Sequence, residues 1–359
     1  MKVYQTNEIK NISLLGGKGS GKTTLAEAML YECGVIKRRG TVEAKNTVSD
    51  YFPVEKEYGY SVFSTVFYAE FLNKKLNVID CPGADDFVGN AVTALNVTDT
   101  GVIVVNAQYG VEVGTQNIFR TATGLKKPVI FALNQLDGEK ADYENVIVAI
   151  QYPLACGAGF NAMIDVLLMK KYSWGPEGGV PTIEDIPESE MERAQELHQA
   201  LVEAAAENDE SLMEKFFDQG HLTEDEMREG IRKGLIDRSI YPVFCVSALK
   251  DMGVRRMMEF LGNVVPFVND MPAPVDTAGK EVKPDSNGPV SIFMFKTTVE
   301  PHIGEVQYFK VMSGTLTAGV DLDNITRGGK ERLAQLFCVC GQIKTQVDKL
   351  CAGDIGATV

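Results

Sequence analysis

A glycine-rich segment near the N-terminus has the residue types and spacing of a phosphate-binding loop. It follows the apolar run 12–15 and precedes a helix-like segment at 24–33. In such a loop glycines let backbone N–H groups surround phosphate oxygens, the lysine (Lys22) reaches the β- and γ-phosphates, and the next hydroxyl (Thr23) binds Mg²⁺. The predicted phosphate-binding residues here are Gly16, Gly17, Lys18, Gly19, Ser20, Gly21, Lys22, Thr23 and Thr24. The alternative is a glycine-rich turn without a ligand, and the strand–loop–helix context argues against it.

A second segment with this chemistry is Asp80-Cys81-Pro82-Gly83, at the end of the apolar run 76–79. An aspartate there can hold Mg²⁺ through water, and the Gly83 N–H can bind a γ-phosphate. Such a turn is common and is a weak signal alone. Its position after the predicted phosphate-binding loop strengthens the prediction.

Two further strand ends fit a guanine base. Asp137, at the end of Asn134-Gln135-Leu136-Asp137, can accept hydrogen bonds from guanine N1 and N2, which adenine cannot supply. The backbone of Ser247-Ala248-Leu249 can cap guanine O6. Because all these segments lie at the carboxyl ends of strands of one predicted sheet, we expect one nucleotide site rather than a set of ordinary turns. The predicted guanine-binding residues are Asn134, Gln135, Asp137, Ser247, Ala248 and Leu249.

The elements that must position these residues are short apolar runs alternating with helix-like segments. Such runs suit strands buried on both faces, and the alternation predicts an α/β domain with a mostly parallel, doubly wound sheet. Segment 62–71 is expected to pair with the second run at the sheet edge. The apolar runs are 12–15, 76–79, 102–105, 129–133 and 243–246.

The gap between the fourth and fifth runs is too long for one crossover and is strongly acidic. Residues 184–229 contain sixteen acidic and three basic residues. Ser189-x-x-Glu192 and Thr223-x-x-Glu226 resemble capping boxes, which indicates helices. We therefore predict an inserted helical subdomain with a solvated acidic surface.

The sequence predicts three parts along the chain. Residues 1–265 form a GTP-binding domain (G domain) with the inserted subdomain at about 152–241. Residues 266–289 are rich in proline and predict a linker. Residues 290–359 show short alternating strands, which predict a small antiparallel β-barrel. Because the last residues are strand-like, this barrel is expected to be truncated at its C-terminal end.

Composition excludes several classes of protein. The formal net charge of −14 argues against a protein that coats nucleic acid. No apolar run approaches the about 18 residues needed to span a bilayer, and residues 1–8 lack a signal-peptide pattern. Seven cysteines, an odd number without zinc-finger spacing, predict reduced thiols. We therefore expect a cytoplasmic protein that uses neither membrane nor DNA.

The nucleotide segments, in this order, resemble those of the translational GTPases, most closely bacterial elongation factor G. Segments 110–120 and 231–244 also resemble that family, and 311–316 and 352–357 resemble its second, β-barrel domain. The resemblance implies a GTPase that acts on the ribosome in the movement of tRNA and mRNA. It implies Mg²⁺ with GTP or GDP as cofactor, held by Thr23, Ser61 and Asp80. It also implies a monomer whose ribosomal contacts are the large-subunit factor-binding site, its stalk and rRNA.

The sequence departs from the family at positions that matter for hydrolysis. Ala84 stands where the family has a histidine that orients the hydrolytic water, so no catalytic residue is assigned. The arginine expected at position 58 is Tyr58, the lysine expected at 135 is Gln135, and the phosphate-binding loop has Gly19 where the family often has aspartate. Losing an acid–base or positioning group costs about 10²–10⁴-fold in rate. The pattern predicts that nucleotide binding is kept and hydrolysis is weakened.

Three functions remain open from the sequence. One is a GTP-hydrolysing translocation factor, in which another group orients the water. The second is a GTP-loaded ribosome-binding switch that works by binding rather than turnover. The third is a ribosomal protection protein of the same architecture. P-loop kinases are disfavoured because they lack the Asn-x-x-Asp guanine reader.

Overall fold

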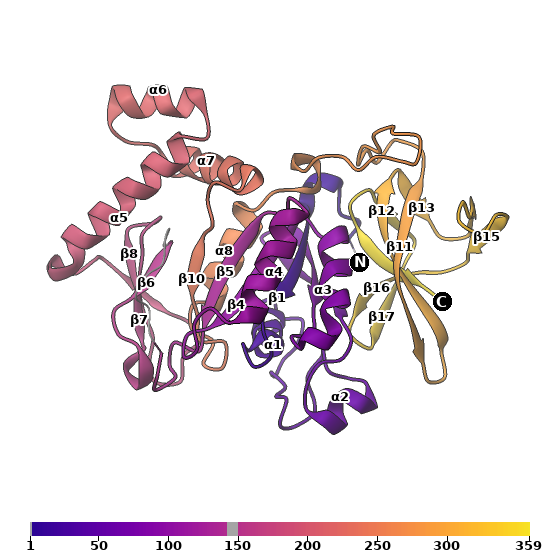
Figure 1. Cartoon of the computed structure of the whole chain (residues 1–359), viewed down its shortest axis with the longest axis horizontal. Helices are drawn as coiled ribbons and strands as arrows, with labels where there is room; N and C mark the ends of the chain where they lie inside the picture. The colour runs from indigo at the N-terminus through magenta and orange to yellow at the C-terminus, as the bar shows by residue number, and fades with distance from the viewer. Residues whose placement is uncertain (1, 142–149) are drawn as a thin grey trace.

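The computed structural model describes residues 2–141 and 150–359. The N-terminal part is built on a six-stranded sheet in the order β10-β5-β4-β1-β3-β2 (Figure 1). All neighbouring strands are parallel except β2 and β3, which form an antiparallel hairpin at the sheet edge. The strands are β1 (Ile9–Leu15), β2 (Thr65–Phe71), β3 (Lys74–Asp80), β4 (Thr100–Asn106), β5 (Val129–Asn134) and β10 (Val243–Cys245). The predicted mostly parallel α/β fold and its edge hairpin are confirmed.

Helices cover both faces of this sheet. Successive side chains of β4 enter opposite cores: Val102 and Val104 pack with α1 and α8, whereas Ile103 and Val105 pack with α3 and α4. Figure 1 shows α3 and α4 in front of the sheet. This two-sided burial explains why the strands read as continuous apolar runs. The covering helices are α1 (Lys22–Glu32), α3 (Val88–Val97), α4 (Val113–Gly124) and α8 (Val254–Asn263), and the short α2 (Pro53–Tyr58) lies in the segment between α1 and β2.

The insertion between β5 and β10 contains the expected helices and also a four-stranded antiparallel sheet. The sheet consists of β6 (Gln151–Pro153), β7 (Ala162–Asp165), β8 (Lys170–Ser173) and β9 (Thr182–Glu184). The helices are α5 (Glu188–Ala206), α6 (Glu210–Gln219) and α7 (Glu224–Asp237). The sheet was not predicted, because strands of three or four residues are too short to show a period.

The two predicted capping boxes have different outcomes. The hydroxyl of Thr223 accepts a hydrogen bond from the Glu226 N–H at 3.4 Å, and Glu226 accepts one from the Thr223 N–H at 2.9 Å. The capping box at α7 is therefore confirmed. The one at Ser189 is wrong, because α5 begins at Glu188 after Pro187 and Ser189 lies inside the first turn.

The C-terminal part is β-rich, as predicted. Its main sheet is antiparallel, in the order β11-β12-β19-β16-β17, and two smaller two-stranded sheets complete it. The strand expected at the end of the sequence is β19, between β12 and β16. The strands are β11 (Ser291–Glu300), β12 (Gly304–Ser313), β13 (Thr315–Thr317), β14 (Val320–Asp323), β15 (Lys330–Leu333), β16 (Leu336–Cys340), β17 (Ile343–Val347), β18 (Lys349–Cys351) and β19 (Ile355–Thr358).

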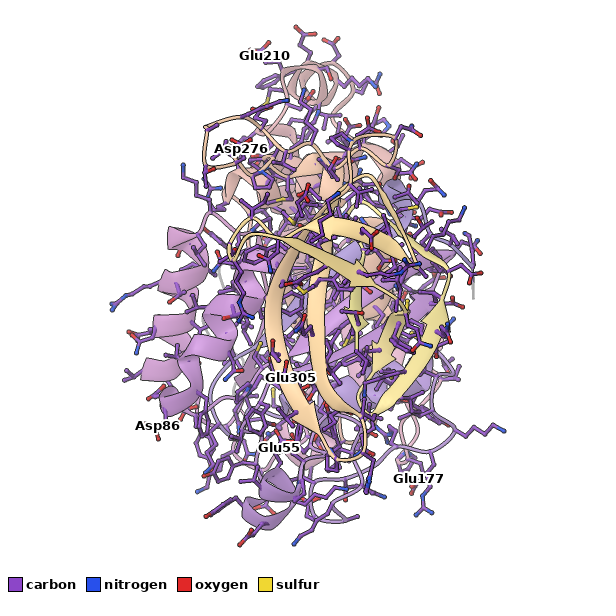
Figure 2. The ribbon with its side chains drawn as sticks, turned by 90° about the vertical axis from the view of Figure 1, so that its right-hand side faces the viewer. Glu55, Asp86, Glu177, Glu210, Asp276 and Glu305 are labelled. Carbon is purple, nitrogen blue, oxygen red and sulfur yellow. The ribbon has the colours of Figure 1, made fainter. Side chains whose placement is uncertain are left out.

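A buried polar network joins the two parts. Lys75 on β3 forms an ion pair with Asp354 at 2.7 Å, with side chains 0% and 4% exposed. Asn77 donates to Asp354 at 3.0 Å, and Lys310 of the barrel binds Asp99 at 3.1 Å. In Figure 2, where the β-rich part faces the viewer, its strands lie in front of the α/β part. These contacts fix the barrel against the strands that carry the predicted nucleotide site.

The domain limits at 265 and 290 stay predictions, and the predicted range 1–265 includes residue 1 and residues 142–149, which lie outside the described residues. No helix in the described part is both long and apolar enough to cross a membrane.

Candidate nucleotide site

The glycine-rich loop runs from β1 into α1, and its glycines are required by geometry. Gly16 has φ +132°, and a Cβ there would lie 2.3 Å from the carbonyl oxygen of Val104. Gly21, the residue just before α1, has φ +89°. The Lys22 Nζ lies inside the loop, 2.9 Å from the Gly16 carbonyl oxygen and 2.8 Å from that of Gly17. Burial lowers the pKa of Lys22, because it disfavours the charged form. An anionic ligand at this loop would stabilise the protonated, positively charged lysine.

The structure brings together the three side chains predicted to hold Mg²⁺. The Thr23 hydroxyl lies 3.3 Å from the Ser61 hydroxyl and 3.3 Å from a carboxylate oxygen of Asp80. Sequence reasoning missed Asp50, a second buried carboxylate beside them. Burial, followed by the charge of Asp50, raises the pKa of Asp80 to about 7.

These residues fit a hard divalent cation. Among the described residues, Oδ1 of Asp80 and Oδ1 of Asp50 are buried without a hydrogen-bond partner. Two buried like charges with unsatisfied oxygens are costly, and Mg²⁺ prefers oxygen ligands of this kind. When bound, Mg²⁺ would supply positive charge to the β- and γ-phosphate oxygens.

The segment after β3 packs directly on the phosphate-binding loop. A Cβ on Gly83 would lie 2.4 Å from the Lys22 Nζ and 2.7 Å from the Gly17 carbonyl oxygen. Ala84 follows in an extended conformation before a short turn that leads into α3. Its methyl group can neither donate nor accept a proton.

The three histidines of the sequence belong to other elements than this segment. His198 is on α5, where its ring bonds to the Val166 carbonyl. His221 follows α6 in the insertion, and His302 is in the turn between β11 and β12. None of them replaces the side chain that position 84 lacks.

Lys18, a residue of the phosphate-binding loop, contacts Tyr60. The Lys18 Nζ is 4.0 Å from the centroid of the Tyr60 ring, and Tyr60 precedes Ser61. Tyr58 and Tyr60 are 6.0 Å apart between ring centroids. The loop and the segment carrying Ser61 are therefore joined by a cation–π contact.

Asn134 and Gln135, two of the predicted guanine-binding residues, form hydrogen bonds to the phosphate-binding loop, and Asn134 also bonds to the turn at Ala248. The Asn134 amide donates to the Ser20 carbonyl at 2.9 Å and accepts from the Ala248 N–H at 2.9 Å. Gln135 donates to the Gly19 carbonyl at 2.9 Å. Gln135, which stands where the family has lysine, is thus joined to the phosphate-binding loop by a hydrogen bond between uncharged groups.

Asp137 and the segment 247–249 lie at adjacent strand ends. The Asp137 side chain is 13% exposed, and Lys250 lies 3.8 Å from its carboxylate. In the turn, the Ser247 N–H donates to the Met252 carbonyl and the Ala248 N–H to Asn134. Within the described residues the Leu249 N–H makes no hydrogen bond, so it is the group of this turn left to form the predicted contact with guanine O6.

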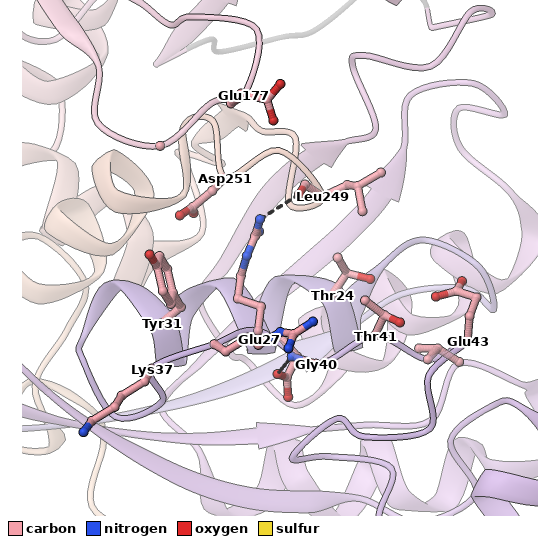
Figure 3. A pocket seen from close by; sticks show the side chains of 14 residues that line it. Thr24, Glu27, Tyr31, Lys37, Gly40, Thr41, Glu43, Glu177, Leu249 and Asp251 are labelled. Carbon is pink, nitrogen blue, oxygen red and sulfur yellow. Dashed lines mark hydrogen bonds between the residues drawn. The ribbon is translucent and has the colours of Figure 1, made fainter.

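Sequence reasoning also missed the loop that follows α1. The Arg39 guanidinium donates to the Ala248 carbonyl at 2.7 Å and to the Leu249 carbonyl at 2.9 Å. Glu27 on α1 accepts from the N–H groups of Gly40 and Val48, each at 2.6 Å. A cavity of about 460 Å³ lies between this loop, α1 and the turn at Leu249 (Figure 3). The basic run 37–39 was the available signal, but spacing alone does not show what it contacts.

The predicted phosphate, Mg²⁺ and guanine residues thus meet at the carboxyl end of one sheet. The arrangement can bind a guanine nucleotide with Mg²⁺. It offers no side chain at position 84 to orient water.

Comparisons with known proteins agree with this arrangement. The family model of the elongation factor Tu GTP binding domain matches residues 7–267, and that of elongation factor G domain 2 matches residues 289–359. A crystal structure of a protein from Thermus thermophilus is similar, with a TM-score of 0.86 and 30% sequence identity. The match covers 98% of this chain and 52% of that protein, so this chain spans about half of its length.

Proposed function

Because this chain belongs to the translational GTPases, as an elongation factor G-like member with an elongation factor Tu-type GTP-binding domain, we propose that it binds GTP with Mg²⁺ and acts on the ribosome in the movement of tRNA and mRNA. The bound state, rather than rapid turnover, performs this work. The observation that carries the proposal is Ala84. It follows Gly83, which still packs against Lys22 in a site that keeps its predicted phosphate-binding lysine, cation ligands and guanine-reading aspartate.

Binding follows from the residues that remain. Lys22 would exchange its contacts with the Gly16 and Gly17 carbonyls for phosphate oxygens. Thr23, Ser61 and Asp80 would hold the cation, and Asp137 would accept from guanine N1 and N2. These contacts form in the ground state, so the nucleotide complex does not need the group that position 84 lacks.

Weak hydrolysis follows from the same position. A water-orienting side chain acts as the nucleophile is aligned, so its absence lowers kcat rather than affinity. The alternative role is ribosomal protection, which would also depend on binding of the GTP-loaded protein to the ribosome rather than on turnover.

The test measures binding and turnover separately. We expect labelled GDP and GTP to bind in the presence of Mg²⁺, ATP not to compete, and Lys22→Ala to abolish binding. With ribosomes, the full-length protein should hydrolyse GTP well below ~1 s⁻¹, the low end of ordinary kcat values, yet still advance tRNA and mRNA in a single-round assay with GTP. Turnover at or above that rate would overturn the proposal of weak hydrolysis. Competition by ATP would overturn guanine selectivity.

A further inference from the structure

Arg39 makes a two-pronged contact with the predicted base-reading turn. Its Nη1 donates to the Ala248 carbonyl at 2.7 Å and its Nη2 to the Leu249 carbonyl at 2.9 Å. The arginine comes from the loop after α1, whereas the turn follows β10, so the contact joins segments far apart in the sequence. In Figure 3 a dashed line at Leu249 marks the second of these hydrogen bonds, at the edge of the cavity that both residues line.

The position of Arg39 is set by its surroundings. The next residue, Gly40, donates its N–H to Glu27 on α1 at 2.6 Å. The guanidinium lies 5.9 Å from the centroid of the Tyr31 ring. Asp251 is a buried carboxylate that lines the same cavity. Burial raises the pKa of Asp251 to about 7, and the nearby Arg39 opposes this shift. The loop and α1 therefore hold the guanidinium at the turn.

The peptide that joins Ala248 and Leu249 is the group that Arg39 controls. A trans peptide places its C=O and N–H on opposite sides. When Arg39 binds the Ala248 carbonyl, the Leu249 N–H must therefore face away from Arg39. This N–H makes no hydrogen bond within the described residues, whereas those of Ser247 and Ala248 are already used.

The positive charge of Arg39, bound to the Ala248 carbonyl, also affects how strongly the Leu249 N–H can donate. Charge-assisted hydrogen bonds are roughly twice as strong as neutral ones, and hydrogen bonds in series polarise one another. The Leu249 N–H should therefore be a better donor, held in a fixed direction.

We propose that Arg39 is a positioning residue for guanine recognition, which fixes and polarises the Ala248–Leu249 peptide so that the Leu249 N–H donates to guanine O6. This inference rests on the proposed nucleotide binding and adds a determinant of base specificity. It also links the base to the loop 39–48, because Glu27 binds the N–H groups of Gly40 and Val48.

The test compares GDP with 6-thio-GDP at pH 7. The analogue keeps the N1 and N2 donors of guanine but has sulfur, a weaker acceptor, in place of O6. Arg39→Gln removes the charge, Arg39→Lys keeps the charge with one point of attachment, and Arg38→Gln is the control. Arg38 is an exposed neighbour with the same charge.

We expect Arg39→Gln to weaken GDP binding about tenfold, the scale of a hydrogen bond that involves a charged group, and to leave 6-thio-GDP binding nearly unchanged. The preference for GDP over the analogue should therefore shrink. The preference of Arg39→Lys for GDP should lie between that of Arg39→Gln and that of the unmodified protein. Arg38→Gln should show the same preference as the unmodified protein.

Two results would overturn the inference. If Arg39→Gln weakens GDP and 6-thio-GDP by the same factor, Arg39 only tethers the loop. If it changes neither, Arg39 has no role in binding. Failure of the proposed function looks different, because the unmodified protein itself would then not prefer GDP to ADP.

Discussion

Position 84 shows how one side chain separates binding from turnover. We expect Ala84→His to raise ribosome-dependent GTP hydrolysis by about 10²-fold or more, because a positioned acid–base group is worth about 10²–10⁴-fold. The gain should occur in kcat, with GTP affinity unchanged. Single-turnover hydrolysis on ribosomes measures it.

Ala84→Phe is the matched control, because it adds a ring without proton chemistry and should stay slow. Equal acceleration by the two variants would show that bulk at position 84, rather than a water-orienting group, limits the reaction.

Asp137 carries the predicted discrimination between bases. Asp137→Asn should weaken GDP binding about 10- to 100-fold, because a charged acceptor for N1 and N2 is lost. The asparagine amide should instead donate to the 2-oxo group of xanthine, so binding of xanthosine diphosphate should strengthen. Competition against labelled GDP measures both, and Asp218→Asn, an exposed acid on α6, is the control that should change neither.

Residues tied to a strand end could be placed from the sequence, and Ser61 was placed by its resemblance to the family, but two other residues of the folded loop before it were missed. Asp80 ends β3 and Thr23 lies in α1 after the loop that follows β1, so their meeting could be predicted from topology. Asp50 and Arg39 reach the site through the path of segment 33–61. That path is set by contacts such as Glu27 with Gly40 and Val48, which no local pattern shows.

At the scale of elements, the caps of the inserted helices show the same contrast. The capping boxes at Thr223 and Ser189 look alike in sequence, but only the first begins a helix. At α5 the N-cap position is taken by Pro187, so Ser189 is already the second residue of the helix. A local pattern shows that a helix is near but not which residue begins it.

We expect Thr223→Ala to lower the free energy of unfolding by about 1 kcal/mol, the usual value of an N-cap hydroxyl. Ser189→Ala should have little effect, since its hydroxyl caps nothing. Urea unfolding of the two variants, followed by far-UV circular dichroism, tests the pair. Equal losses would contradict the assignment of the caps.

At the scale of the whole molecule, the interface between the two parts depends on buried charge. Asp354→Ala should lower the free energy of unfolding by about 3 to 5 kcal/mol, because Lys75 would be left buried and unpaired. The double variant Lys75→Met/Asp354→Leu should lose much less, because it removes both charges together. Urea unfolding measures both, and a double variant as unstable as the single one would argue against the unpaired charge as the cause.

Lys296 gives this interface a dependence on pH. It donates to the Ser64 carbonyl across the interface, and burial lowers its pKa from 10.5 to about 8. Between these values the unfolded chain holds a proton that the folded chain does not. The contribution of Lys296 therefore makes stability rise with pH from about 8 to 10.5.

Lys296→Met should flatten that rise by about 1 to 3 kcal/mol, since one pKa unit corresponds to about 1.4 kcal/mol. Urea midpoints at several pH values, compared between the variant and the unmodified protein, measure it. Parallel curves for the two proteins would show that folding does not lower the pKa of Lys296.

The pairing of β5 with β10 also has a consequence for synthesis of the protein. β5 ends at Asn134 and β10 begins at Val243, so residues 135–242 must be made before the pair can form. The thermodynamic cost of so long a loop is small, about 0.6 kcal/mol for each doubling of length, but contacts this distant in sequence form slowly. The phosphate-binding loop can therefore exist on a nascent chain well before Leu249 has left the exit tunnel. We expect a translating chain to acquire guanine nucleotide only after β10 has docked, so that loading with nucleotide marks the completion of the domain.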